Sequence, residues 1–186
     1  VRLGPPAPRS IKPSIVKSLK SLYQLLGQGG QAPSLKQIGD LRETLFEASK
    51  CQPEDIFYSI ELWDMIVETY RKNCPSLPFN DFFWNIKAMH APVLSILKIA
   101  EKAPPADCYH TISTGYAGLL GMFLRLMKNK PLMVTEHGIY TKERQIDLYQ
   151  VDWIQEHNPD IAAGLDSRIS YIRDLWLKFF EGLGRL

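Results

Sequence analysis

Apolar residues recur at helical spacing through the first hundred residues of the chain. Two predicted helices carry such residues three or four positions apart, at Ile15, Leu19, Leu22 and Leu26, and then at Leu35, Ile38, Leu41 and Leu45. A third predicted helix begins near Ser59 and has its apolar face at Ile60, Trp63, Val67 and Tyr70. A short aromatic-rich segment at 82–86 precedes a fourth helix, which is marked by Met89, Val93, Ile96 and Leu97 and ends before Pro104.

In the second part of the chain, short continuous apolar runs appear among the segments with helical spacing. Apolar runs near 107–112 and 131–135 predict two strands, with a glycine-rich helix at about 115–128 between them. This order predicts adjacent, buried parallel strands joined by a right-handed crossover, and therefore an α/β fold with a helix-rich first half. A closing helix has its apolar face at Ile169, Ile172, Trp176, Phe179 and Leu183.

These patterns divide the chain into three parts. Residues 1–13 are proline-rich and form a linker or an extended arm, 14–103 form a helical region, and 104–186 form strand–helix units. Trp153, Trp176 and the pair Phe179–Phe180 are expected in the core. Two strands do not make a viable parallel sheet, so we expect further strands from sequence outside this chain. We therefore interpret the chain as a piece of a longer protein.

Composition indicates a globular protein. Of 186 residues, 45% are hydrophobic and 23% are charged, as in ordinary soluble domains. The net charge of +2 is too small to favour nucleic acid as a partner. No apolar run approaches the roughly 20 residues that a membrane-spanning helix needs. The three cysteines (Cys51, Cys74 and Cys108) cannot all pair and lack metal-site spacing, so we expect a reducing, cytoplasmic location, with Cys108 as a buried thiol.

Polar residues follow both predicted strands at the point where each strand ends. Ligands of open α/β sheets bind at the carboxyl ends of the strands, so these residues are candidates for one site. They are Ser113, Thr114 and Gly115 after the first strand, and Glu136, His137 and Gly138 after the second.

His137 is the candidate for a catalytic contact. A neutral imidazole at a strand end can hydrogen-bond a hydroxyl or a phosphate oxygen; the alternative is a structural histidine that caps the turn. Glu136 either orients His137, binds sugar hydroxyls, or is a solvated turn residue. Ser113 or Thr114 can cap the following helix, whose free N–H groups suit an anion or a hydroxyl oxygen.

Several neighbouring residues have a functional and a simpler interpretation. His110 lies before the strand end and is expected to be a satisfied core histidine. Lys142 and Arg144 stand early in a helix, where the dipole disfavours cations, and this favours an anion nearby; the alternative is that both are solvated. Gly118 and Gly121 permit close approach either to a ligand or to the neighbouring strand.

Familiar catalytic motifs are absent from the sequence: there is no dinucleotide fingerprint, no phosphate loop and no His-Glu-x-x-His zinc motif. Two segments, DCYHTISTGYAGLLG (107–121) and PLMVTEHGIYTKER (131–144), closely resemble the amino-terminal domain of family 4 retaining glycosyltransferases. The specific similarity is to the PelF-like branch, which is linked to Pel exopolysaccharide synthesis. The segments 152–154 and 179–186 also resemble that branch.

This resemblance implies two Rossmann-like domains facing a cleft, with the present chain as part of the amino-terminal, acceptor-side domain. It implies a hexosyltransferase whose donor, a nucleotide-sugar such as UDP-glucose, binds mainly to the other domain. His137 matches the histidine that contacts the donor sugar, and Tyr116 joins the expected substrate-binding residues. The family needs no metal, and the displaced diphosphate helps to deprotonate the acceptor. Expected partners are the nucleotide-sugar, a glycan acceptor and a membrane-associated synthase complex.

Two departures from the family pattern limit what this chain can do. The glycine-rich loop of the family's first strand–helix unit is absent, and so is the donor domain with its paired glutamates, so the isolated chain is expected to be inactive. The alternative function is a noncatalytic protein-interaction domain with the same fold, docking through the helical first hundred residues. Their aromatic side chains suit either a docking surface or a core. A donor domain encoded downstream would favour the transferase.

Overall fold

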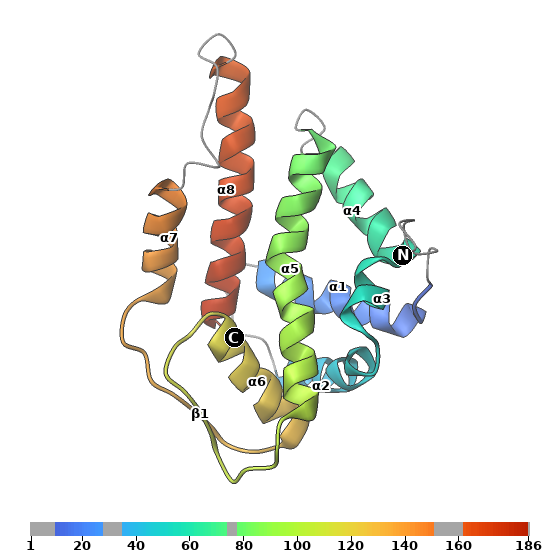
Figure 1. The fold of residues 1–186 in the computed structure, drawn as a ribbon, viewed down its shortest axis with the longest axis vertical. Helices are drawn as coiled ribbons and strands as arrows, with labels where there is room; N and C mark the ends of the chain where they lie inside the picture. Colours follow the sequence, from blue (N-terminus) through green and yellow to red (C-terminus); the bar gives the residue numbers. More distant parts are fainter. Residues whose placement is uncertain (1–9, 28–34, 74–77, 151–161, 186) are drawn as a thin grey trace, which may run out of the picture.

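The computed structural model describes residues 10–27, 35–73, 78–150 and 162–185. Their elements are α1 (Pro13–Gly27), α2 (Leu35–Ser49), α3 (Pro53–Phe57), α4 (Ile60–Asn73), α5 (Phe79–Lys102), β1 (Tyr109–Thr111), α6 (Tyr116–Lys128), β2 (Leu132–Val134), α7 (Tyr140–Gln150) and α8 (Ala162–Arg185). Figure 1 shows α5 and α8 side by side, with α7 on the other side of α8 and the strands near one end of the molecule.

Some of the sequence predictions concern residues outside those described. They include most of the predicted arm, Cys74 and Trp153. The side chains of Leu22, Leu26, Leu35, Ile38 and Ile169 are also outside the described set, although all five positions fall in helices.

Helix α5 forms the centre of the core. It packs against α2, α3, α4, α6 and α8. Its fully or nearly fully buried side chains are Phe82, Met89, Val93, Leu94, Leu97 and Ala100. Burial of each larger apolar side chain stabilises the fold by roughly 1.5–3 kcal/mol, so this line of residues is the main source of cohesion in the helical region.

The aromatic-rich segment and the helix after it are one helix, and the prediction of two pieces is wrong. α5 runs without interruption from Phe79 to Lys102 and contains Pro92. Proline in a helix interior removes one backbone hydrogen bond and normally weakens the helix. Here Met89 and Val93 are buried on either side of Pro92, and tertiary packing outweighs the lost bond. The predicted end before Pro104 is confirmed.

Helix α4 buries a different face from the predicted one. Its start near Ser59 is confirmed, since the Leu62 N–H donates to Ser59 Oγ at 3.2 Å. Leu62 and Ile66 are buried, whereas Ile60 and Trp63 are each 47% exposed. The helix carries apolar residues on two faces, and contact with α5 decides which of them is covered.

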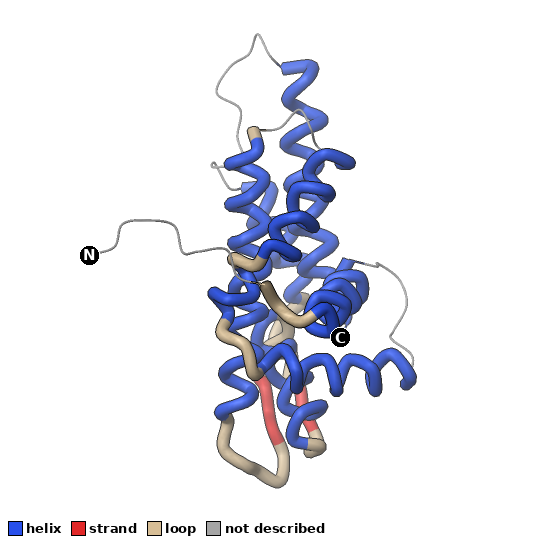
Figure 2. The backbone as a smooth tube through the Cα atoms, turned by 90° about the vertical axis from the view of Figure 1, so that its right-hand side faces the viewer, coloured by secondary structure: helices blue, strands red, loops and turns tan. Residues whose placement is uncertain are grey.

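The predicted strand–helix–strand unit is confirmed. β1 and β2 are parallel neighbours, with Tyr109 opposite Leu132 and Thr111 opposite Val134, and α6 joins them. Figure 2 shows the two strands side by side. Gly121 allows α6 to approach both strands, because a Cβ there would lie 2.7 Å from Leu132 Cδ1 and 2.9 Å from Thr111 Cγ2.

The predicted burial of the two strands is wrong. Met133 and Val134 are 52% and 45% exposed, and Cys108 is exposed as well. Parallel sheets are normally covered on both faces. In the described part of the chain, α6 is the element that packs extensively on the strands, so the apolar side chains on the other face remain in contact with solvent.

The closing helix α8 has the predicted apolar face. Ile172, Trp176, Phe179 and Leu183 are buried, and the Trp176 indole N–H donates to Asn85 Oδ1 at 2.9 Å. This bond joins α8 to α5. Among the described helices, none is both long enough and apolar enough to cross a membrane.

The close approach at Gly121 predicts that alanine substitution will change the free energy of unfolding very differently at two glycines of α6. Gly121→Ala should lower the free energy of unfolding by about 1–3 kcal/mol through overpacking. Gly118→Ala is the matched control, since its Cβ would have no contact closer than 3.8 Å and Ala improves helix propensity by about 0.8–1 kcal/mol. Urea denaturation of both variants measures the difference, and equal stabilities would contradict the predicted packing.

His90 predicts a pH-dependent loss of stability. Burial lowers the pKa of His90 to about 4, against the opposing effect of the hydrogen bond to the Ile86 carbonyl. Above pH 6.5 the imidazole is neutral in both folded and unfolded states. As pH falls toward 4, only the unfolded chain gains the proton, so stability is lost across this window.

The measurement is urea denaturation at pH 7.5 and 4.5. The loss attributable to His90 should be about 2–3 kcal/mol. Between pH 7.5 and 4.5, the free energy of unfolding of His90→Gln should fall by less than that of the parent, and the difference should equal this amount. An identical pH dependence in the two proteins would show that His90 titrates normally.

Candidate functional site

The loops that follow β1 and β2 lie next to each other and form one rim of the sheet. Thr111 pairs with Val134, and the Thr135 N–H donates to the Thr111 carbonyl at 2.8 Å. The two strands therefore end together. We use "the rim" for residues 112–115 and 135–139, which connect β1 to α6 and β2 to α7.

Gly115 makes the turn from β1 into α6. It is the N-cap residue and has φ +69°, a conformation that glycine adopts readily and other residues rarely. A Cβ there would also lie 2.6 Å from Cε1 and 2.7 Å from the hydroxyl of Tyr140. The first residue of α7 therefore packs directly on the turn that begins α6.

The prediction that Ser113 or Thr114 caps α6 is wrong. No side chain at the N-cap bonds to the first turn of the helix. Ser113 Oγ donates to the Thr114 carbonyl at 3.2 Å, and Thr114 Oγ1 donates to Glu136 Oε1 at 3.2 Å. The left-handed conformation of Gly115 redirects the chain just before the helix, and both hydroxyls bond within the rim.

Glu136 joins the two halves of the rim. Its Oε1 accepts the Thr114 hydroxyl and also the backbone N–H of Tyr140, the latter at 3.4 Å. A carboxylate at the start of α7 interacts favourably with the helix dipole. The described contacts of Glu136 are thus with Thr114 and Tyr140, and none is with His137.

Both histidines near the rim are exposed. Among the described residues, His137 has no hydrogen-bond or ion-pair partner, so its ring is accessible to a ligand. His110 Nε2 lies 2.9 Å from Thr135 Oγ1. The prediction that His110 is a core residue is wrong, because no described element covers its face of β1.

Tyr116 is directed away from the rim. Its hydroxyl donates to the Met89 carbonyl of α5 at 3.1 Å, and burial raises its pKa well above the ordinary value. The pKa of Tyr140 is also raised, again chiefly by burial. Both phenols are therefore protonated at neutral pH, and neither can act as a base there.

An aromatic cluster supports the rim from behind. It consists of Tyr116, Tyr140, Trp176, Phe179 and Phe180. Trp176 and Phe180 stack with ring centroids 5.5 Å apart, and Phe180 meets Tyr140 edge-on at 5.8 Å. Sequence reasoning did not identify Tyr140; its only signal was an aromatic residue two positions after Gly138, at the start of a helix.

The two basic residues of α7 differ in their surroundings. Arg144 pairs with Asp147 at 2.7 Å, and its guanidinium carbon lies 5.4 Å from the centre of the Tyr140 ring. Lys142 is exposed and has no ion-pair partner among the described residues. Of the two cations, Lys142 is the one that remains available to an anion.

The rim offers hydroxyls, a carboxylate and the imidazole of His137 to a ligand, and the imidazole of His110 lies beside it on β1. These groups hydrogen-bond and can exchange protons, which suits a ligand rich in hydroxyl groups. In the ranges that the structure describes, no group of three or more His, Cys, Asp or Glu side chains could hold a metal ion.

Contact between Gly115 and Tyr140 predicts a coupled pair of substitutions. Gly115→Ala should destabilise the fold by about 3 kcal/mol, of which roughly 1–2 comes from positive φ and the rest from the clash with Tyr140. Tyr140→Ala in the same chain should remove the clash alone. A double-mutant cycle on urea unfolding should give a coupling energy of at least about 1 kcal/mol, and additive effects would contradict the contact.

The comparison with known proteins identifies a family. The sequence profile described as "Domain of unknown function (DUF3492)" matches residues 4–186. Domains of this family form the amino-terminal part of glycosyltransferase-like proteins. No curated protein and no solved structure matches the chain significantly. Because the profile spans nearly every residue, the chain belongs to the DUF3492 domain family.

Proposed function

We propose that this chain is the acceptor-side domain of a nucleotide-sugar-dependent retaining glycosyltransferase and is inactive as an isolated domain. The observation that carries the proposal is the paired rim, in which two parallel strands end together and present Glu136, His137 and Thr114 in one place. Membership of a family found at the amino-terminal end of glycosyltransferase-like proteins supports the same function.

In this proposal the rim contacts the sugar through hydrogen bonds. His137 contacts the donor sugar, and its exposed ring, which has no partner among the described residues, is consistent with that role. Glu136 has a positioning role, because it holds the β1 and β2 loops together through Thr114 and the Tyr140 N–H. Lys142 can meet an anionic group of the donor or the acceptor.

The finer assignments belong to the same proposal. They are a Rossmann-like sheet completed by further strands, a PelF-like role in exopolysaccharide synthesis, a donor such as UDP-glucose, and a cytoplasmic location beside a membrane-associated synthase complex. The open face of β1 and β2 supports the first of these, since parallel strands are usually covered on both sides.

The test is turnover of the full-length protein with a nucleotide-sugar and a glycan acceptor. His137→Ala should lower kcat about 100-fold, a loss of roughly 2.7 kcal/mol of transition-state stabilisation. Because His137 is exposed, the urea midpoint should not change. Arg125→Ala, on the exposed side of α6, is the control and should keep normal turnover.

A second candidate is a noncatalytic interaction domain. The observation in its favour is the exposed aromatic surface of α3–α5, where Tyr58, Trp63 and Trp84 are 42%, 47% and 59% exposed. If a well-folded His137→Ala protein retains full turnover, His137 is not part of the site. If the full-length protein transfers no sugar, the transferase role fails and the interaction domain gains support.

A further inference from the structure

A concave site lies in the helical region, away from the rim. Helices α4, α5 and α8 surround a cavity of about 500 Å³, with Lys20 of α1 on its edge. Binding sites for small organic molecules usually measure about 300–1,000 Å³. None of the residues that line this cavity belongs to the rim.

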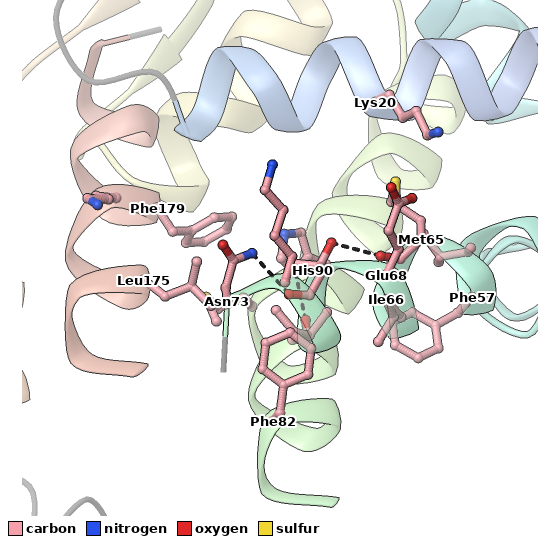
Figure 3. Close-up of a pocket in the computed structure, with 16 residues that line it drawn as sticks. Lys20, Phe57, Met65, Ile66, Glu68, Asn73, Phe82, His90, Leu175 and Phe179 are labelled. Atoms are coloured by element: carbon pink, nitrogen blue, oxygen red, sulfur yellow. Dashed lines mark hydrogen bonds between the residues drawn. The ribbon is translucent and has the colours of Figure 1, made fainter. Parts of the chain in front are cut away.

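The wall of the cavity is mainly apolar. Its apolar lining includes Leu62, Ile66, Phe82, Met89, Leu175 and Phe179. Figure 3 shows Phe179 and Leu175 facing it from α8 and Phe82 from α5. The polar groups of Thr69 and Asn73 are already engaged within α4, since the Thr69 hydroxyl donates to the Met65 carbonyl and the Asn73 amide to the Thr69 carbonyl. The wall therefore favours an apolar body.

The charged residues of the cavity are predominantly positive. Lys20, Lys72 and Lys178 come from three different helices and are all exposed, against the single carboxylate of Glu68. Among the described residues, none of the three lysines has an ion-pair partner. His90, whose pKa is lowered to about 4 by burial, adds no charge at neutral pH.

We propose that this cavity binds an anionic amphiphile, a small molecule with an apolar chain or ring and one carboxylate or phosphate group. The apolar body lies against the apolar lining of the cavity, which includes Leu62, Met89 and Phe179. The anionic group lies at the edge, where the lysines of α1, α4 and α8 supply unpaired positive charge. The site is independent of the sugar chemistry proposed for the rim.

The experiment compares three probes that share an eight-carbon chain: octanoate, 1-octanol and octylammonium. Binding to the protein is followed by ¹H–¹³C spectra of the methyl groups, with Met89 and Ile66 as reporters inside the cavity. Octanoate should shift both methyl signals and saturate, 1-octanol should bind several-fold more weakly, and octylammonium more weakly still. Octyl phosphate tests whether phosphate replaces carboxylate.

Charge removal at the edge tests the role of the lysines. Lys72→Gln/Lys178→Gln should weaken octanoate binding by about tenfold, since an exposed ion pair contributes roughly a threefold effect, and should leave 1-octanol binding unchanged. Lys102→Gln/Arg125→Gln removes two exposed charges elsewhere and should bind octanoate normally.

Three results would overturn the proposal. The first is equal affinity for octanoate and octylammonium, and the second is no saturation of the Met89 and Ile66 signals at millimolar octanoate. The third is an equal loss of octanoate binding in Lys72→Gln/Lys178→Gln and in the control Lys102→Gln/Arg125→Gln. Since these readouts do not involve sugar transfer, they are separate from the test of His137.

Discussion

The aromatic cluster behind the rim is the interaction on which the candidate site depends. Tyr116 is the first residue of α6, and its hydroxyl donates to the Met89 carbonyl of α5. Tyr140 is the first residue of α7 and packs on Gly115. Both rings meet Phe180 of α8. Two loops that are separated in sequence are thereby held against one helical core. Aromatic pairs of this geometry contribute about 0.5–1.5 kcal/mol beyond burial, so the cluster holds both loops with several such contacts.

The side chains that hold the rim in position are different from those available to a ligand. The side of the loops that faces α5 and α8 is fixed by apolar contact. Glu136 and His137 of the β2–α7 loop, and Lys142 in the first turn of α7, are exposed to solvent. Groups intended to contact a ligand must be accessible, yet they act effectively only when their backbone is held in position. The Thr114–Glu136–Tyr140 hydrogen bonds add a direct polar link between the loops at that accessible surface.

The helical region is connected to the same support. Phe179 lines the apolar cavity between α4, α5 and α8 and also contacts Tyr116, with ring centroids 6.0 Å apart. Trp176 bonds to Asn85 of α5 and stacks on Phe180. The same side chains of α8 therefore pack in the helical core and support the rim. This shared packing explains how a helix-rich first half can stabilise so small a sheet.

The sequence by itself determined the local elements. The helical periods, the two short apolar runs and the glycine-rich segment between them correctly predicted α1, α2, α8 and the parallel β1–α6–β2 unit, because these signals depend on neighbouring residues in the chain. Polar residues after each strand likewise marked the rim. Tertiary structure decided which face of α4 is buried, the continuity of α5 through Pro92, the exposure of β1 and β2, and the contact of Tyr140 with Gly115. Each of these depends on what packs from a distant segment, and spacing along one segment carries no information about that partner.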